Sequence, residues 1–338
     1  MRLSITFFAL IVLMAGSALS CSFDPAGLNP GGTDAASDST VPDADAADVP
    51  DVVDAATDAD AHHDAGDGGS ECTAADNECL DYYRLNVCTG TGEMTQMTCP
   101  YGCDPSVPTC FELTPSNGVD PSLVLTPGVG DWYLSTDALL ITDTGEIIIN
   151  GNQYRIPGAG LDTNTGIYFD VITLPDGTQA GLFVFQNLTL VAGATLTAHG
   201  DLPLILLADT TMIAGVVDVS AKVSSCSNDS RTCAGPGGFM GGNANRGGQG
   251  PGAGGAGKDD YWGDESGGGG AGYLTAGGKG GGGDGGNAGG VYGTDSCEPL
   301  LGGSGGGGGG HNTPTSTSTS QGKGGGGGGA VQISALSY

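Results

Sequence analysis

The chain has 338 residues, of which 67 are glycine, and its 9 basic side chains stand against 38 acidic ones, giving a net charge of −29. So acidic a chain repels phosphate backbones and anionic membrane surfaces, which excludes nucleic acid as a partner and polybasic attachment to lipid headgroups. Ten cysteines beside glycine-rich and aspartate-rich stretches indicate an exported protein of several segments, not one compact cytosolic domain.

Residues 1–20 have the features of an export signal peptide. Arg2 precedes an apolar stretch that is too short to span a bilayer, and small residues follow it. The sequence Ala-Leu-Ser-Cys at 18–21 resembles the lipobox of bacterial lipoproteins. That resemblance implies acylation of Cys21, a membrane partnership through an N-terminal lipid anchor, and, because Ser22 follows, an outer-membrane or cell-surface location. Ordinary cleavage after Ser20, which the same small residues permit, implies a secreted protein instead.

Residues 21–70 predict a disordered linker. From residue 22 to residue 70 the chain holds twelve aspartates and no lysine, arginine or glutamate, interleaved with alanine, proline, serine and threonine. Such a segment has few groups worth burying and repels itself, so it is expected to act as a solvated spacer. The aspartates near its end lack the ligand order of a calcium-binding loop, and no metal site is predicted.

Residues 71–112 contain six cysteines and predict a small disulfide module, because so short a segment buries too little apolar surface to fold without covalent links. Six cysteines permit fifteen pairings, which the spacing leaves open. A zinc site would need close cysteine pairs, which are absent. The stretch from Asn86 to Cys110 resembles cysteine-rich modules of secreted myxobacterial-type lipoproteins. The cysteines expected in disulfides are Cys72, Cys79, Cys88, Cys99, Cys103 and Cys110, together with Cys226, Cys233 and Cys297 around the glycine-rich tract.

Residues 118–222 predict an all-β domain, since short apolar runs alternate there with turn residues. Residues 190–198 align with residues 212–220 at an offset of 22, and each unit has an Ala-Gly corner. This period favours the rungs of a partial right-handed parallel β-helix. A β-sandwich with similar hairpins is the alternative. The positions expected to stack inward are Leu196 and Leu206, and those expected to form corners are Gly193 and Gly215.

Residues 223–329 form a glycine-rich, low-complexity insertion before a terminal strand at 330–338, with 44 glycines among the 96 positions from 235 to 330. Ordering such a backbone costs on the order of 100 kcal/mol, so a flexible loop is the first expectation. The alternative packs the glycine runs as extended three-fold helices, which requires neighbouring segments to pair. The Walker A-like stretch 252–258 is followed by Asp259 and has no flanking strand or helix, so no nucleotide cofactor is predicted.

Together, the apolar run, the Ala-Gly strand, the glycine block and the closing strand resemble glycine-rich, cysteine-containing surface lipoproteins of the myxobacterial and deltaproteobacterial type. This resemblance covers roughly residues 188–338. It implies an exported cell-envelope protein with a non-catalytic structural, adhesive or matrix-interaction role. The partners that it implies, besides the membrane, are envelope or extracellular polysaccharide or protein. No catalytic residue, cofactor or metal comes with it.

Two other interpretations remain open. A β-helix carbohydrate-active enzyme, either a lyase or a glycosidase, would need paired carboxylates. Nothing in the sequence marks such a pair, and His199, in the sequence His-Gly-Asp, suits a turn better than a catalytic site. A truncated fragment without independent function is the other alternative. The carboxylates that an enzyme would draw on are Asp170, Asp201, Asp209 and Asp218.

Overall fold

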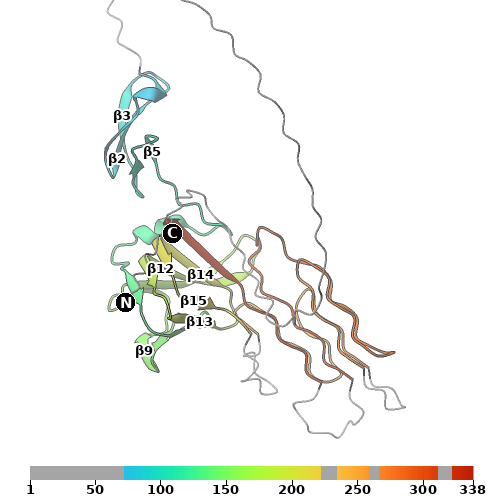
Figure 1. Cartoon of the computed structure of the whole chain (residues 1–338). Coiled ribbons are helices and arrows are strands. Elements are labelled where there is room, and N and C mark those ends of the chain that lie inside the picture. The colour runs from blue at the N-terminus through green and yellow to red at the C-terminus, as the bar shows by residue number, and fades with distance from the viewer. Residues whose placement is uncertain (1–71, 222–233, 259–265, 311–321, 338) are drawn as a thin grey trace, which may run out of the picture.

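The computed structural model describes residues 72–221, 234–258, 266–310 and 322–337 (Figure 1). The described residues form an almost entirely β structure, as the sequence predicts, with two short 3-10 helices, η1 (Ala74–Asp76) and η2 (Pro121–Leu125). The predicted signal peptide and linker lie outside the described residues, and so do Cys21, Cys226 and Cys233.

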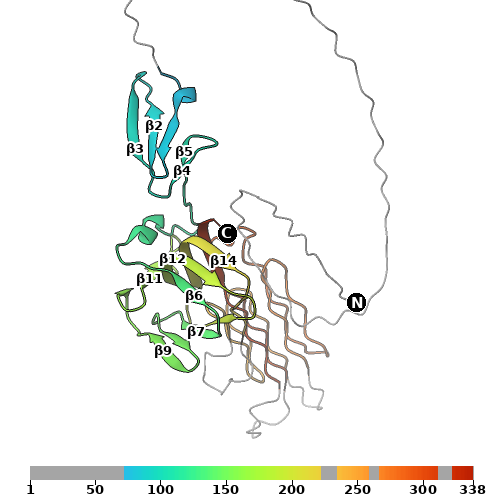
Figure 2. The same ribbon diagram turned by 60° about the vertical axis from the view of Figure 1, so that its left-hand side comes forward.

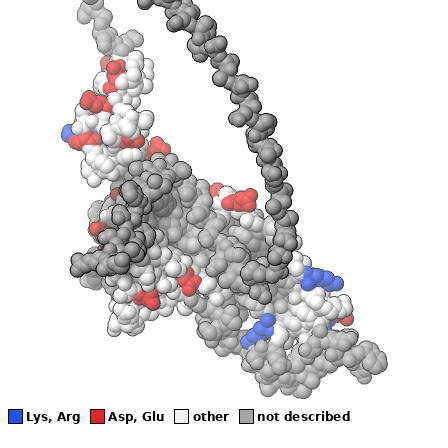
Figure 3. Space-filling view, viewed as in Figure 1, with Lys and Arg blue, Asp and Glu red and all other residues white. Residues whose placement is uncertain are grey.

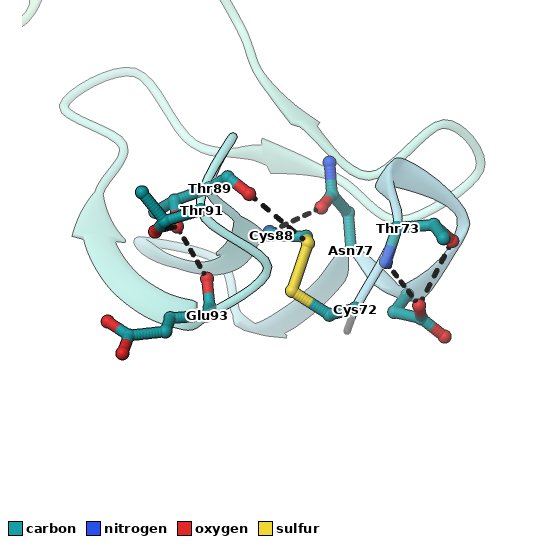
Figure 4. The surroundings of a disulfide bond; sticks show 8 residues. Cys72, Thr73, Asn77, Cys88, Thr89, Thr91 and Glu93 are labelled. Carbon is teal, nitrogen blue, oxygen red and sulfur yellow. Dashed lines mark hydrogen bonds between the residues drawn. A yellow bond between two sulfur atoms is a disulfide. The ribbon is translucent and has the colours of Figure 1, made fainter. Parts of the chain in front are cut away.

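The six-cysteine module has one antiparallel sheet of three strands and a second of two (Figure 2). Its disulfides join Cys72 to Cys88, Cys79 to Cys103 and Cys99 to Cys110. Beside the first of them, the Cys88 N–H donates to Asn77 Oδ1 over 2.9 Å (Figure 4). Cystine sulfur supplies much of the module's core, as expected of so small a unit. The strands are β1 (Glu78–Asp81), β2 (Arg84–Cys88), β3 (Met94–Thr98), β4 (Cys103–Asp104) and β5 (Thr109–Cys110).

The β domain is built on two sheets, in which parallel strands are flanked by antiparallel ones. The large sheet has the order β10-β11-β12-β14-β16, and β6 pairs with the second half of β12. Its strands are β6 (Trp132–Leu134), β10 (Gly160–Asp162), β11 (Ile167–Thr173), β12 (Gln179–Leu190), β14 (Leu204–Ile213) and β16 (Val331–Ser337). The second sheet has the order β15-β13-β7-β8-β9, from β7 (Ala138–Ile141), β8 (Ile147–Ile149), β9 (Asn152–Arg155), β13 (Thr195–His199) and β15 (Val216–Asp218).

Apolar side chains cover both faces of the large sheet. Phe183 of β12 and Leu206 of β14 pack toward the second sheet, where they meet Leu196 of β13. Leu182 of β12 points the other way and joins Val124 of η2. Side chains of a strand alternate between faces, so a strand buried on both faces is apolar throughout, and β12 and β14 have this composition.

The parallel strands follow one another at nearly the predicted spacing, but their register differs from the alignment. Leu190 pairs with Ile213 and Thr195 with Val216, offsets of 23 and 21, where the alignment predicted 22 for both. Leu196 and Leu206 are buried as expected. Gly193 has a φ of +87°, which suits a corner, whereas Gly215 has ordinary φ and is required because a Cβ would collide with Ala194 O. Both sheets are open, and the β-helix is not confirmed.

Thr211 on β14 is a buried polar side chain with no partner for its hydroxyl among the described residues. It is 2% exposed and pairs in register with Leu188 of β12, which belongs to the core between the two sheets. Replacing the hydroxyl by a methyl in Thr211→Val keeps the shape and removes a desolvated donor, so we expect a gain of about 1 kcal/mol in the free energy of unfolding. Urea denaturation measures it. A loss of stability would mean that the hydroxyl makes a hydrogen bond in solution.

Candidate functional site

The glycine-rich tract forms hydrogen bonds with a three-residue period. The N–H groups of Phe239, Gly242 and Asn245 donate to Gly303 O, Gly306 O and Gly309 O, over 3.0, 2.8 and 2.9 Å. An extended chain with three residues per turn and no internal hydrogen bonds is a polyproline II-type helix, whose backbone groups at every third residue point to the same neighbour. The described part of the tract is therefore a set of paired extended helices. The expectation of a flexible loop is wrong for these residues, and the alternative of paired three-fold helices is correct.

The pairing arranges these helices in two layers (Figures 1 and 2). In the first layer, 275–282 pairs with 266–273, which pairs with 302–310, which pairs with 322–329. The second layer has the order 284–292, 252–258, 246–249 and 235–245. Bonds such as those from the Gly254 and Gly257 N–H groups to Gly305 O and Gly308 O, at 3.0 and 2.8 Å, join the two layers. We call this unit the glycine bundle.

Close backbone contact explains the glycine content of the bundle interior. A Cβ on Gly305 would collide with Met240 O, one on Gly307 with Gly255 O, and one on Gly324 with Gly306 O. The φ angles of Gly305, Gly307 and Gly324 lie outside the left-handed region, so glycine is needed there for its lack of a side chain and not for its conformational freedom. Each interior glycine is thus dictated by the helix beside it.

One face of the bundle carries almost no side chains. Its positions lie on the outer side of the first layer, at every third residue, and those on the two outermost helices are open: a Cβ on Gly278, Gly281, Gly325 or Gly328 would meet no described atom within 4 Å. The opposite layer carries Asn287, Lys258 and Val291, the last 62% exposed. We call the bare surface the glycine face. It consists of Gly267, Gly270, Gly278, Gly281, Gly303, Gly306, Gly309, Gly325 and Gly328.

Two tyrosines mark the end of the glycine face. Tyr273 and Tyr292 pack edge to face with ring centroids 4.9 Å apart, and the Tyr292 hydroxyl donates to Gly302 O over 2.7 Å. Burial raises the pKa of both phenols, so they stay neutral donors. A groove of about 370 Å³ opens beside them. It is lined by 271–275, Cys297, Gly303, Ser304 and 326–328.

The bundle is continuous with the β domain. The Gly329 N–H donates to Val219 O and the Ala330 N–H to Pro236 O, over 2.8 and 2.9 Å, immediately before β16 begins. Cys297 is disulfide-bonded, while Cys226 and Cys233 lie outside the described residues. The chain therefore leaves the second sheet after β15, forms the bundle, and returns to the large sheet as β16.

The structure does not bring the four candidate carboxylates together. Asp170 on β11 pairs with Leu182 on β12, which in turn pairs with Ile205 on β14. Asp209 lies four residues beyond Ile205 on β14, so two strand spacings and four residues separate the two aspartates. That separation is about 16 Å, against the roughly 5–9.5 Å between paired glycosidase carboxyls. Asp218 belongs to the second sheet and accepts from Ser220 N–H, and the Asp201 N–H donates to the Asp143 carboxylate. His199 O accepts from Thr142 N–H over 2.8 Å.

The Asp209 carboxyl is partly buried. Gln186 Nε2 donates to its Oδ2 over 3.2 Å, whereas its buried Oδ1 has no partner within the described structure. Burial raises the pKa of this carboxyl despite the hydrogen bond from Gln186, which lowers it. Because its pKa is higher in the folded chain than in the unfolded one, the ionised form destabilises the fold.

Asp209→Asn is therefore expected to raise the melting temperature at pH 7. The gain should shrink as the pH falls and vanish below the ordinary aspartate pKa of 3.8, where the wild-type carboxyl is protonated in both states. Thermal denaturation of both proteins between pH 3 and pH 7 measures this. The exposed Asp176→Asn, at a carboxylate that accepts from the Thr178 N–H and hydroxyl, is the control for replacing an aspartate by asparagine. An Asp209→Asn gain that is independent of pH would contradict the buried carboxylate.

The Walker A-like stretch is part of the bundle and not a phosphate-binding loop. Its Gly254 and Gly257 N–H groups, which such a loop would aim at phosphate, already donate to carbonyls of 302–310, and the Lys258 N–H donates to Asp284 O. In the parts of the chain that the structure describes, no cluster of three or more His, Cys, Asp or Glu side chains could hold a metal ion. A search of the same residues finds no helix long and apolar enough to cross a membrane.

No protein-family model, no curated protein and no solved structure matches this chain.

The glycine bundle is the candidate site, and the sequence predicted its paired helices only as an alternative. Its signal was the recurrence of glycine runs of the same length, such as 305–310 and 324–329, which hold six glycines each. Composition suggests a loop, but runs of equal length separated by turn residues suggest helices stacked side by side.

Proposed function

We propose that this is an exported cell-envelope protein, anchored through an acylated Cys21, with a non-catalytic structural or adhesive role. The observation that carries the proposal is the glycine bundle, a hydrogen-bonded unit that presents backbone where an enzyme site would need positioned side chains. The three disulfides of the six-cysteine module suit an oxidising compartment. The acidic linker 21–70 would hold the folded part away from the lipid surface. For the β domain, the successive parallel pairs support a short right-handed parallel β-helix as the finer description.

Fractionation of the host envelope, with mass spectrometry of the mature N-terminus, tests this proposal. We expect the protein in the outer-membrane fraction with a diacylated Cys21. The Cys21→Ser variant should lose the acyl chains and move to the soluble or secreted fraction, because the chains supply the anchoring. An unmodified N-terminus on the membrane-bound protein would overturn the lipid anchor. Hydrolysis or cleavage of a polysaccharide, abolished by Asp209→Asn but not by Asp176→Asn, would overturn the non-catalytic role.

A further inference from the structure

The glycine face keeps glycine where the chain's own packing does not need it. At Gly278, Gly281, Gly325 and Gly328 a side chain would enter open space among the described residues, and the φ angles suit any residue. Glycine in such a position costs conformational entropy on folding and returns nothing within the monomer. In the bundle interior, by contrast, a Cβ on Gly305, Gly307 or Gly324 would collide with the backbone of a neighbouring helix, and that backbone requires the glycine. The open positions lack that neighbour.

The bundle itself shows what kind of neighbour fits. Each glycine helix is joined to the next by N–H to O=C bonds at every third residue, as from Gly303 and Gly306 N–H to Gly328 and Gly325 O, over 2.8 and 2.9 Å. On the two outermost helices of the first layer, a glycine likewise faces solvent at every third residue, at 278 and 281 on one helix and at 325 and 328 on the other. A further glycine helix can approach this face as closely as the interior helices approach each other, while a chain with side chains is held away. The matching partner is another glycine bundle.

Charge permits two copies to meet there. The whole chain has a net charge of −29, which opposes self-association through most of its surface. The described bundle residues carry three acidic side chains, Asp284, Asp295 and Glu298, and four basic ones, Arg246, Lys258, Lys279 and Lys323. In Figure 3 most side chains coloured on the six-cysteine module are red, whereas most of those coloured toward the far end of the bundle are blue. Over residues 235–330 the full sequence has seven acidic and four basic side chains, a net charge of −3, so this tract is far less acidic than the rest of the chain.

We propose that the glycine face is a self-association surface, on which a second copy of this chain docks with its own glycine face. The contact joins two first layers, so that backbone packs against backbone as it does between the layers of one bundle. This deepens the proposed structural role and rests on it. Because the two contacting faces are nearly neutral while the chains are strongly acidic, salt should strengthen the association by screening repulsion between the copies.

Sedimentation velocity of the purified full-length protein over a concentration series tests the proposal. The variants Gly281→Gln and Gly325→Gln each place one side chain on the glycine face, from helices at opposite edges of the first layer. Gly290→Gln is the matched control, since Gly290 is equally exposed, has open space at its Cβ and belongs to 284–292 in the other layer. We expect wild type and Gly290→Gln to self-associate with equal dissociation constants, and the two face variants to be at least tenfold weaker. Gly281→Ala, which adds a methyl alone, gives the same comparison should glutamine disturb the fold.

Three results would overturn the proposal. The first is a wild-type protein that stays monomeric at every concentration and salt level. The second is self-association that all three glutamine variants retain, which would place the contact elsewhere. The third is a monomer that sediments with an insoluble polysaccharide such as cellulose, where Gly281→Gln loses the binding and Gly290→Gln keeps it. That result would show that the glycine face binds a polysaccharide and not a second copy of the chain. None of these results bears on the acylation of Cys21, so the envelope assignment stands or falls by its own test.

Discussion

Gly307→Ala is expected to destabilise the protein by about 3 kcal/mol or more, although it adds one methyl group. Gly307 lies in 302–310, which is hydrogen-bonded to helices of both layers, and its new Cβ would collide with Gly255 O. Backbone cannot rotate aside as a side chain does, so the two helices must separate and lose the bonds between them. Urea denaturation measures the loss.

Gly278→Ala is the matched control for that experiment. It makes the same substitution in the same layer, but at an open position, so we expect little change or a slight gain from the reduced entropy of the unfolded chain. Equal effects at both positions would show that glycine serves only backbone flexibility. A large loss at Gly307 alone establishes that the bundle exists in solution.

Arg155→Met is expected to cost about 4 kcal/mol of folding free energy. Arg155 on β9 is 1% exposed, and its guanidinium lies 5.5 Å from the centre of the Phe169 ring. Its five N–H groups reach five backbone carbonyl oxygens at 2.7–3.2 Å, and the methionine would leave these without donors. The carbonyls belong to Gly145, Ile156, Gly158, Gly160 and Ile167.

Denaturation of Arg155→Met is best compared with Arg84→Met. Arg84 is exposed in the six-cysteine module and pairs with Asp81 over 2.5 Å, and an exposed ion pair of this kind contributes little. Its loss should leave the unfolding midpoint of the β domain unchanged. Arg155→Lys should fall between wild type and Arg155→Met, because a lysine retains the charge but offers three donors. Equal stability of the lysine variant and wild type would contradict the role given to the guanidinium geometry.

The all-β class was predictable from sequence, because alternating apolar runs report directly on strands. The one-residue error in register arose because the alignment matched the two Ala-Gly corners residue for residue, whereas the corners differ in length. Four residues separate Leu190 from Thr195, but only two separate their partners Ile213 and Val216. The length of a corner is not reported by its Ala-Gly composition.

Order in the glycine tract was harder to predict, and for a different reason. Conformational entropy argues against an ordered glycine chain when the chain is considered alone. What offsets that entropy is contact between segments as distant in sequence as Gly242 and Gly306, which no local pattern reports. The burial of Arg155 was likewise not predictable, since a single arginine in a hairpin is expected at the surface unless the carbonyls around it are known.

The bundle also changes how the stability of this protein should respond to temperature. Hydrocarbon exposed on unfolding raises the heat capacity, and peptide groups exposed on unfolding lower it. Unfolding the bundle exposes chiefly peptide groups, so the heat-capacity increment per residue should be well below that of an ordinary domain of this length. The stability curve is then shallow, and chilling weakens the bundle far less than it weakens a core held together by hydrophobic side chains.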